Sequence, residues 1–296
     1  MTAPLPSSTP RHQFEAQRAQ SRLGRLVRAV GLIVAFYVIW AVLEWTALQI
    51  PVANRLGFRD VSVPWIALVS MVIATYLMLR VVEKLPWSVV ALDRAAASPG
   101  VLIKGAAWGG LTIGIASLAL LGIHQLQIDR TIPGSWWASA ERSTAALLPA
   151  AFFEELFFRG YAFSVLRRVT GWKTALVVTS IAFGVVHSWN PGADAEAILA
   201  VTVAGFFLGA ILLATRSLYA AGAAHFAWNW VMAVAFHIEV SGLASPNVDY
   251  RTIETGPDWL TGGQWGPEGG VVAVAGMFVV FFYLYGRYLR RMEWKA

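Results

Sequence analysis

The sequence predicts an all-α membrane protein, a polytopic bundle of about eight transmembrane helices around a central cavity. Of the 296 residues, 57% are hydrophobic and only 14% are charged, whereas soluble domains carry about a quarter charged residues. Several apolar runs reach the roughly 17–25 residues that a helix needs to cross a bilayer. Backbone groups in hydrocarbon must be paired within their own segment, so helices are the expected form of these runs.

The elements follow one another without an internal repeat or a second domain. Residues 1–28 are expected to form a disordered basic tail, because the first twenty are rich in Pro, Ser, Gln and Arg. A single transmembrane domain covers 29–290, and 291–296 form a second short tail. The first apolar run is too long for a signal peptide and no cleavage pattern follows it, so it is expected to be retained. The expected spans are 29–50, 64–82, 101–123, 143–166, 172–189, 196–214, 218–238 and 270–289.

The basic residues indicate how the chain is oriented. With these spans, seventeen Lys and Arg residues lie on one side of the membrane and five on the other. The positive-inside rule then places both termini in the cytoplasm, as an even number of spans requires. This distribution explains the net charge of +6 and the pI of about 9.8. We therefore expect membrane lipid as a partner and no nucleic acid, and the sequence does not indicate an oligomeric state.

The stretch "AFFEELFFRG" at 151–160 places three charged residues inside an apolar span. Together they would cost about 8–10 kcal/mol near mid-membrane before any pairing. Glu155 and Arg159 stand four apart on one helical face and are expected to pair. Glu154 lies about 100° round the helix from Glu155 and has no local partner. An ionisable residue within a span is by default a candidate for function.

Two other spans supply polar side chains at a similar depth. "FGVVH" ends in His187, and "HFAWN" supplies His225 and Asn229, which share a helical face. In such a set Glu154 can act as a base toward water that His187 orients, while His225 and Asn229 stabilise an oxyanion. That combination of groups would hydrolyse an amide bond. A buried salt bridge with a protonated Glu154, serving only to hold the bundle together, is the structural alternative.

Metal chemistry is the second alternative for these residues. Two histidines and a glutamate with an open position can hold catalytic zinc. The chain has no cysteine, and no HExxH motif, the commonest helical zinc arrangement, occurs in it. We therefore expect no metal and no other cofactor.

The three motifs together resemble a known family. "EELFFRG" fits EExxxR, "FGVVH" fits FxxxH and "HFAWN" fits HxxxN, in this order in successive membrane helices. This resembles the CPBP family, which comprises CAAX prenyl protease 2 enzymes and bacterial relatives, including bacteriocin-processing and lysostaphin-resistance-protein-A-like proteins. The similarity covers roughly 140–240. It implies a bundle of about eight helices around an intramembrane catalytic cavity, and the activity of an intramembrane glutamic endopeptidase. The residues that it assigns are Glu154, His187, His225 and Asn229 as catalytic, with Glu155 and Arg159 as orienting residues.

Three functions remain open at this point. The first is a protease that cuts a membrane-anchored or peptide substrate. The second is a non-catalytic bacteriocin-immunity or regulatory protein of the same fold. The third is a transporter or proton-coupled channel, which is disfavoured because no inverted repeat and no paired broken helices occur. The short loops are typical of a bacterial inner-membrane protein, for which a prenylated native substrate is not expected.

The acidic residues of the later loops are expected to be solvated on the non-cytoplasmic side. They are Asp194, Glu196, Asp249, Glu254, Asp258 and Glu268.

Overall fold

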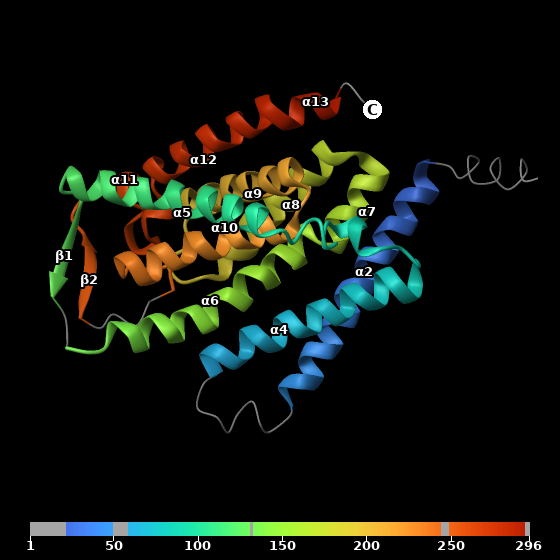
Figure 1. Cartoon of the computed structure of the whole chain (residues 1–296), viewed down its shortest axis with the longest axis horizontal. Coiled ribbons are helices and arrows are strands. Elements are labelled where there is room, and N and C mark those ends of the chain that lie inside the picture. Colours follow the sequence, from blue (N-terminus) through green and yellow to red (C-terminus); the bar gives the residue numbers. More distant parts are fainter. Residues whose placement is uncertain (1–21, 50–58, 131–132, 244–248, 294–296) are drawn as a thin grey trace, which may run out of the picture.

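The computed structural model describes residues 22–49, 59–130, 133–243 and 249–293. It is an all-α bundle with a small two-stranded sheet at one end (Figure 1), so the predicted fold class is confirmed. The N-terminal end of α2 and the C-terminal helix α13 lie at the opposite end from the sheet. The helices are α2 (Arg22–Leu48), α4 (Arg59–Tyr76), α5 (Pro99–Gly122), α6 (Trp136–Arg159), α7 (Tyr161–Thr170), α8 (Trp172–Val186), α9 (Ala195–Thr215), α10 (Leu218–Trp230), α11 (Asp258–Thr261), α12 (Val271–Leu284) and α13 (Arg290–Glu293).

Within the described residues, five helical segments are long and apolar enough to cross a membrane. They are Leu23–Leu48, Val61–Val82, Pro99–Gly122, Ala195–Thr215 and Val271–Met292. The other three expected spans correspond to α6, α8 and α10. α6 is interrupted by charged residues, and α8, with 15 residues, is only about 23 Å long. The three helices that fall short are the ones that carry the polar motifs.

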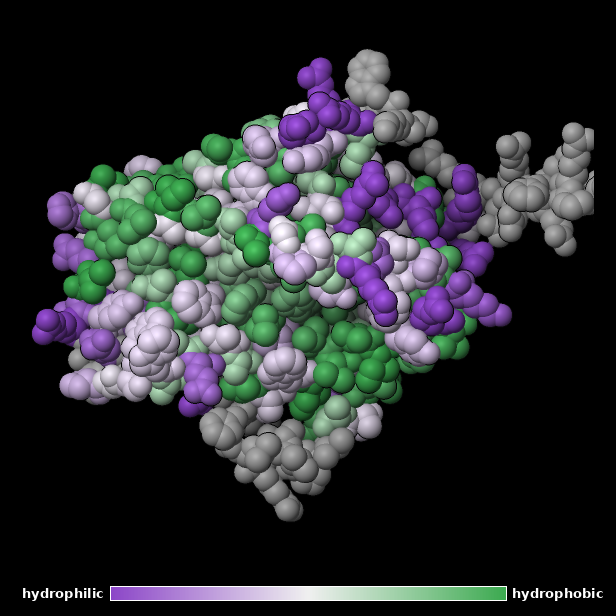
Figure 2. Space-filling view, viewed as in Figure 1, coloured by the Kyte–Doolittle hydropathy of each residue, from purple (hydrophilic) through white to green (hydrophobic). Residues whose placement is uncertain are grey.

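The apolar helices differ in how far the bundle encloses them. In α9, 61% of the most apolar window is buried, whereas in α2 only 11% is buried. Large apolar side chains of α2 such as Val34, Val38 and Val42 are more than half exposed. Figure 2 shows the matching surface, with hydrophobic residues between two hydrophilic ends. This surface and the five apolar segments identify an integral membrane protein, with lipid against the outer helices.

Small residues bring α5 and α10 into close contact. A Cβ atom added at Gly105 would lie 2.2 Å from the carbonyl oxygen of Ala220, and one at Gly109 would lie 1.9 Å from that of Ala224. Glycines spaced in this way allow two membrane helices to pack backbone against backbone. This contact positions α10, in which Ala224 directly precedes His225.

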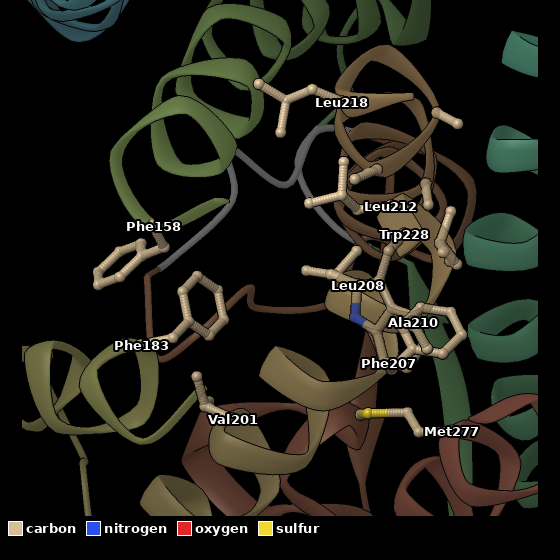
Figure 3. Close-up of a cluster of buried hydrophobic side chains, with 14 of the residues drawn as sticks. Phe158, Phe183, Val201, Phe207, Leu208, Ala210, Leu212, Leu218, Trp228 and Met277 are labelled. Atoms are coloured by element: carbon tan, nitrogen blue, oxygen red, sulfur yellow. The ribbon is translucent and has the colours of Figure 1, made fainter. Parts of the chain in front are cut away.

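An aromatic and aliphatic core surrounds the centre of the bundle (Figure 3). Phe158 of α6, Phe183 of α8, Phe207 of α9 and Trp228 of α10 are all buried in it. The rings of Phe158 and Phe183 meet edge to face, with centroids 5.1 Å apart. The four helices that bear or border the polar motifs are thereby held by one continuous core.

The expected span 143–166 is not one helix, so this prediction was wrong. α6 ends at Arg159, and α7 begins at Tyr161 after a break at Gly160. A Cβ atom at Gly160 would lie 2.3 Å from the carbonyl oxygen of Leu156, so glycine is required there. Both flanks are apolar, which is why hydropathy alone did not reveal the break.

Two further boundaries differ from the predictions. α2 begins at Arg22, inside the expected tail 1–28, and residues 1–21 lie outside the described residues. Among the expected cytoplasmic residues 291–296, 291–293 continue α13 and the rest lie outside the described residues. The sheet was not expected either: β1 (Leu126–Arg130) pairs antiparallel with β2 (Tyr250–Glu254), in the register Leu126↔Glu254 to Arg130↔Tyr250.

Candidate active site

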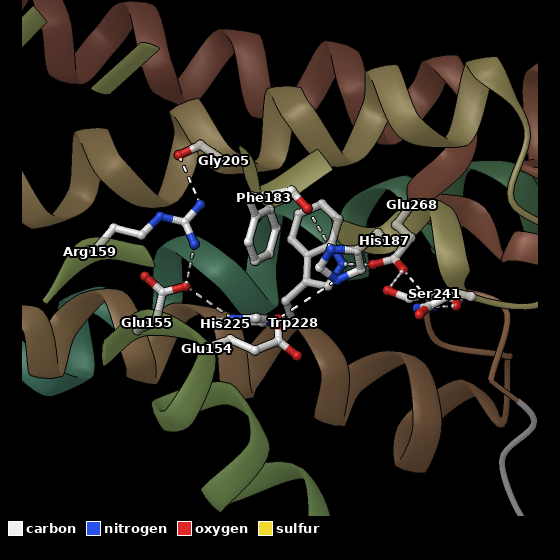
Figure 4. A network of polar contacts seen from close by, with 11 residues as sticks. Glu154, Glu155, Arg159, Phe183, His187, Gly205, His225, Trp228, Ser241 and Glu268 are labelled. Carbon is white, nitrogen blue, oxygen red and sulfur yellow. Dashed lines mark hydrogen bonds and ion pairs between the residues drawn. The ribbon is translucent and has the colours of Figure 1, made fainter. Parts of the chain in front are cut away.

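The residues singled out in the three motifs meet at the centre of the bundle (Figure 4). Glu154 projects from α6, His187 follows the last residue of α8, and His225 lies on α10. Oε2 of Glu154 lies 3.7 Å from Nε2 of His187 and 3.9 Å from Nε2 of His225. Each separation is too long for a direct hydrogen bond and short enough for one water or substrate atom to bridge.

His187 is held by its own helix. Its Nδ1–H donates to the carbonyl oxygen of Phe183 at 2.7 Å. Because a carbonyl oxygen only accepts, Nδ1 must carry a proton; in the tautomer with a single ring proton, Nε2 is then an acceptor for a molecule between it and Glu154. The phenylalanine of "FGVVH" thus sets the tautomer of the histidine four residues later.

Glu155 connects α6 to α10. Its Oε1 accepts from Nη1 of Arg159 at 3.1 Å, so the predicted ion pair is present. The same oxygen lies 3.1 Å from Nδ1 of His225, which donates to it. Both members of the ion pair have fully buried side chains. His225 is therefore oriented through Nδ1 and presents Nε2 to Glu154.

Arg159 is fixed from two further sides. Its Nη2 donates to the carbonyl oxygen of Gly205 at 3.2 Å. Its guanidinium lies 4.1 Å from the centre of the Phe183 ring, within cation–π range. Arg159 therefore ties α6 to α8 and α9 in addition to holding Glu155.

Glu154, unlike Glu155, has a carboxylate oxygen that lies near the histidines without a hydrogen bond to either. Its Oε2 is buried and finds no hydrogen-bond partner among the described residues. The side chain as a whole is 28% exposed, because it faces a cavity of about 310 Å³. A carboxylate oxygen with an unused lone pair beside a cavity is placed to accept a proton from a bound molecule.

The cavity also collects the other predicted site residues. His187, His225 and Asn229 line it together with Glu154, and Asn229 also borders a smaller pocket beside it. Arg142 of α6 lines the same cavity. Twelve residues separate Arg142 from Glu154, which is about 18 Å along the helix. The cavity therefore runs from the charged centre toward the end of the bundle where α6 begins.

Glu268 is a residue of this region that the sequence analysis misplaced. It was expected to be solvated, but it is only 7% exposed. Its Oε1 accepts from the backbone and hydroxyl of Ser241 at 2.6 and 2.7 Å, and its Oε2 accepts from Nε1 of Trp228 at 2.8 Å. It borders the smaller pocket with His187 and Asn229. No motif pointed to this residue; the available signal was Trp265, a large apolar residue three positions earlier, which is buried.

The roles of these residues differ in how far geometry supports them. Glu154, His187, His225 and Asn229 share one cavity, and Glu155 and Arg159 orient His225. Across the part of the chain that the structure describes, no group of three or more His, Asp or Glu side chains has the spacing of a metal site. The catalytic roles and the metal-free chemistry stay predictions.

Residues 135–231 match the family model of type II CAAX prenyl endopeptidase Rce1-like proteins. The matched segment contains all three motifs and all six predicted site residues, and it confirms the resemblance drawn from them. No curated protein and no solved structure matches the chain. The family is one of proteases, so the match supports an endopeptidase in general.

Proposed function

We propose that this protein is a glutamate-dependent intramembrane endopeptidase, in which Glu154 activates a water molecule against a peptide bond. The observation that carries the proposal is the unsatisfied Oε2 of Glu154, which faces Nε2 of both histidines across a cavity. A base, a group to orient water and donors for an oxyanion are what amide hydrolysis requires.

The charges of the site balance in one protonation state. Arg159 offsets Glu155, and a doubly protonated His225 offsets Glu154. In that state Nδ1–H of His225 donates to Glu155, and Nε2–H is free to donate into the cavity. The mechanism uses the tautomer of His187 in which Nδ1–H donates to the carbonyl oxygen of Phe183 and Nε2 accepts. One imidazole is thereby a donor toward the cavity and the other an acceptor.

The reaction then follows from these positions. A water donates one hydrogen bond to Nε2 of His187 and the other to Oε2 of Glu154. Its oxygen attacks the scissile carbonyl carbon while Glu154 takes the proton. The oxyanion accepts hydrogen bonds from Nε2–H of His225 and from the amide of Asn229. The C–N bond breaks, and Glu154 passes its proton to the leaving nitrogen, which yields a free amine and a carboxylic acid that still carries the second proton of the water.

The substrate is a peptide segment that reaches the cavity from within or beside the membrane. The cavity of about 310 Å³ accommodates a few residues of an extended chain, and between Arg142 and Glu154 its wall along α6 includes Ala146, Leu147 and Ala150. A membrane-anchored or lipidated peptide fits this position, and a prenylated CAAX peptide is the natural first test because of the family match.

Glu154→Gln is the decisive variant, because it keeps the shape of the side chain and removes the base. We expect the rate of cleavage of a prenylated CAAX reporter peptide in proteoliposomes to fall by about 10²–10⁴-fold. Glu141→Gln is the matched control, since Glu141 is an exposed glutamate of the same helix; it should leave the rate unchanged. Thermal unfolding in detergent confirms that both variants fold.

A second measurement covers native substrates. The ends of membrane peptides are compared between cells that express the wild-type protein and cells that express Glu154→Gln. New termini that depend on Glu154 support the protease. If reporter cleavage and peptide ends are the same for both proteins, the proposed function is wrong, and a non-catalytic role of the fold is left.

A chelator distinguishes the glutamate mechanism from a zinc-dependent one. The glutamate mechanism predicts that a strong chelator leaves the cleavage rate unchanged. Loss of activity that returns on addition of zinc would instead assign Glu154, His187 and His225 as ligands.

A further inference from the structure

A second cavity lies at the end of the bundle opposite the sheet. Its volume is about 410 Å³, and it shares no lining residue with the cavity of Glu154. Its walls come from the turn before α5, from α7, and from the ends of α6, α9 and α13. The residues that line it are Ser88, Val89, Val90, Ala91, Asp93, Arg159, Phe163, Ser164, Arg167, Leu212, Leu213, Arg216 and Met292.

The charge of this cavity is strongly positive. It is lined by Arg159, Arg167 and Arg216, against the single carboxylate of Asp93. Oδ1 of Asp93 accepts from the backbone N–H groups of Ala95 and Ala96 at 3.0 and 3.2 Å, so it is engaged in its own turn. Arg159 is paired with Glu155, so two guanidinium groups, those of Arg167 and Arg216, are left with one lining carboxylate that is already hydrogen-bonded.

Glu83, which pairs with the residue after Arg167, is engaged outside this cavity. Glu83 accepts from Nη1 and Nη2 of Arg168 at 3.1 and 2.9 Å, and from the hydroxyl of Tyr161 at 2.7 Å. Within the described residues, no carboxylate lies at ion-pair distance from Arg167 or Arg216. Burial, together with the like charges of Arg168 and Arg216, lowers the pKa of Arg167. Among the described side chains, no carboxylate compensates these two cations.

Arg159 adds an interior wall to the same cavity. The residue is 1% exposed, and its Nε has no hydrogen-bond partner among the described residues. A buried donor without a partner costs about 1–3 kcal/mol, and an acceptor inside the cavity would remove that cost. Phe163, Leu212 and Leu213 give the remaining wall an apolar character.

We propose that this cavity is a binding site for the phosphate headgroup of an anionic phospholipid. Arginine forks suit phosphate oxygens, and the apolar wall suits the start of an acyl chain. The site lies at the end of the molecule where α7 and α13 meet the hydrophilic surface (Figures 1 and 2), which the distribution of basic residues predicts to face the cytoplasm. Free phosphate shares the headgroup chemistry but not the acyl chains, so the two sources can be separated.

The test uses the full-length protein in phosphatidylcholine vesicles with a trace of fluorescent phosphatidylglycerol, and reads energy transfer from the protein's tryptophans to the lipid. Competition with unlabelled phosphatidylglycerol gives the relative affinity. We expect Arg216→Gln to weaken binding about fivefold, and Arg167→Gln with Arg216→Gln to weaken it about 20–30-fold. Arg216→Lys keeps the charge and should retain most of the binding.

The controls separate a built site from general surface charge. Arg291→Gln removes one charge from an exposed position of α13 that does not line the cavity, and it should leave the affinity unchanged. Equal binding by the double variant and the wild type, or an equal loss with Arg291→Gln, would overturn the site. Displacement of the lipid by millimolar inorganic phosphate alone would overturn the lipid assignment in favour of a soluble anion. This readout does not depend on peptide cleavage, so it stands apart from the proposed function.

Discussion

The two cavities differ in how their charged side chains are compensated. In the central cavity, carboxylates and imidazoles face one another, and Arg159 offsets Glu155. In the cavity at the end of the bundle, Arg159 is paired with Glu155, Arg167 and Arg216 have no carboxylate at ion-pair distance among the described residues, and the lining carboxylate of Asp93 is hydrogen-bonded in its own turn. The first arrangement suits proton transfer within the protein, and the second suits an anion from outside. The comparison indicates that charge left unpaired by the protein, rather than the presence of charged residues alone, points to a binding site for a charged ligand.

A single residue connects the two cavities. Arg159 lines the second cavity and holds Glu155, which in turn holds His225 beside Glu154. Arg159→Met should have the largest effect, because it leaves Glu155 buried without a cation. We expect the free energy of unfolding to fall by about 3–5 kcal/mol and the cleavage rate to fall with it, measured by thermal unfolding in detergent and by the reporter assay.

The double variant Glu155→Gln with Arg159→Met is the control for this prediction. It removes both charges and should recover most of the lost stability, although not the orientation of His225. An Arg159→Met protein as stable as the wild type would show that the buried pair does not link the two regions.

The next largest effect is expected where α5 supports α10. A methyl group at Gly109 would lie 1.9 Å from the carbonyl oxygen of Ala224, whereas one at the adjacent Gly110 would lie 3.5 Å from the nearest atom. Gly109→Ala should therefore cost about 3 kcal/mol of stability and displace His225, while Gly110→Ala should be tolerated. Similar melting temperatures for the two variants would contradict this account of the helix contact.

Glu268 tests the wall of the smaller pocket beside the central cavity. All three of its partners are donors, so the amide group of Gln would point a donor at another donor. Glu268→Gln is expected to cost about 2 kcal/mol of stability, and the exposed Glu196→Gln should cost nothing measurable. Equal thermal unfolding of the two variants would mean that Glu268 does not hold Trp228 and Ser241 in place.

The smallest effects are expected in the pH dependence of stability, through Glu83 and Glu254. Burial would raise the pKa of Glu83, but hydrogen bonds from Arg168 and Tyr161 and the charge of Arg168 outweigh it, so the pKa lies below the ordinary value. Its contribution to stability is present above that ordinary value and is lost as the pH falls through the lower folded-state value. Glu83→Gln should therefore lower the melting temperature at pH 7 more than under acidic conditions.

Glu254 should show the opposite dependence. Burial raises its pKa to about 7, opposed by the Thr261 hydrogen bond and reinforced by Asp258 and Glu239. Its contribution to stability is complete below its ordinary pKa and is lost as the pH rises through about 7. Above pH 7, the free energy of unfolding of Glu254→Gln should exceed that of the wild type by about 1 kcal/mol after solvent screening. Thermal unfolding at several pH values measures this dependence. A stability difference between Glu254→Gln and the wild type that stays constant from pH 5 to 8 would contradict the raised pKa of Glu254.

Local spacing predicted part of the site. Glu155 and Arg159 pair because four residues bring side chains together on any α-helix, and His225 and Asn229 share a face for the same reason. The bond from His187 to the carbonyl oxygen of Phe183 also spans four residues, but it depends on the end of α8, which the sequence does not specify. Glu268 was misjudged because its burial depends on Trp228 and Ser241, which lie 40 and 27 positions away.

By itself, the sequence determined that this is an apolar helical membrane protein with an unpaired Glu154 and three motifs, because hydropathy and helical periodicity are local properties. Only the tertiary structure decided that Gly160 divides the fourth expected span, that Glu154 meets two imidazoles, and that three arginines line one cavity. These features depend on the packing of helices far apart in the chain, where close backbone contacts such as Gly109 against Ala224 select which faces meet.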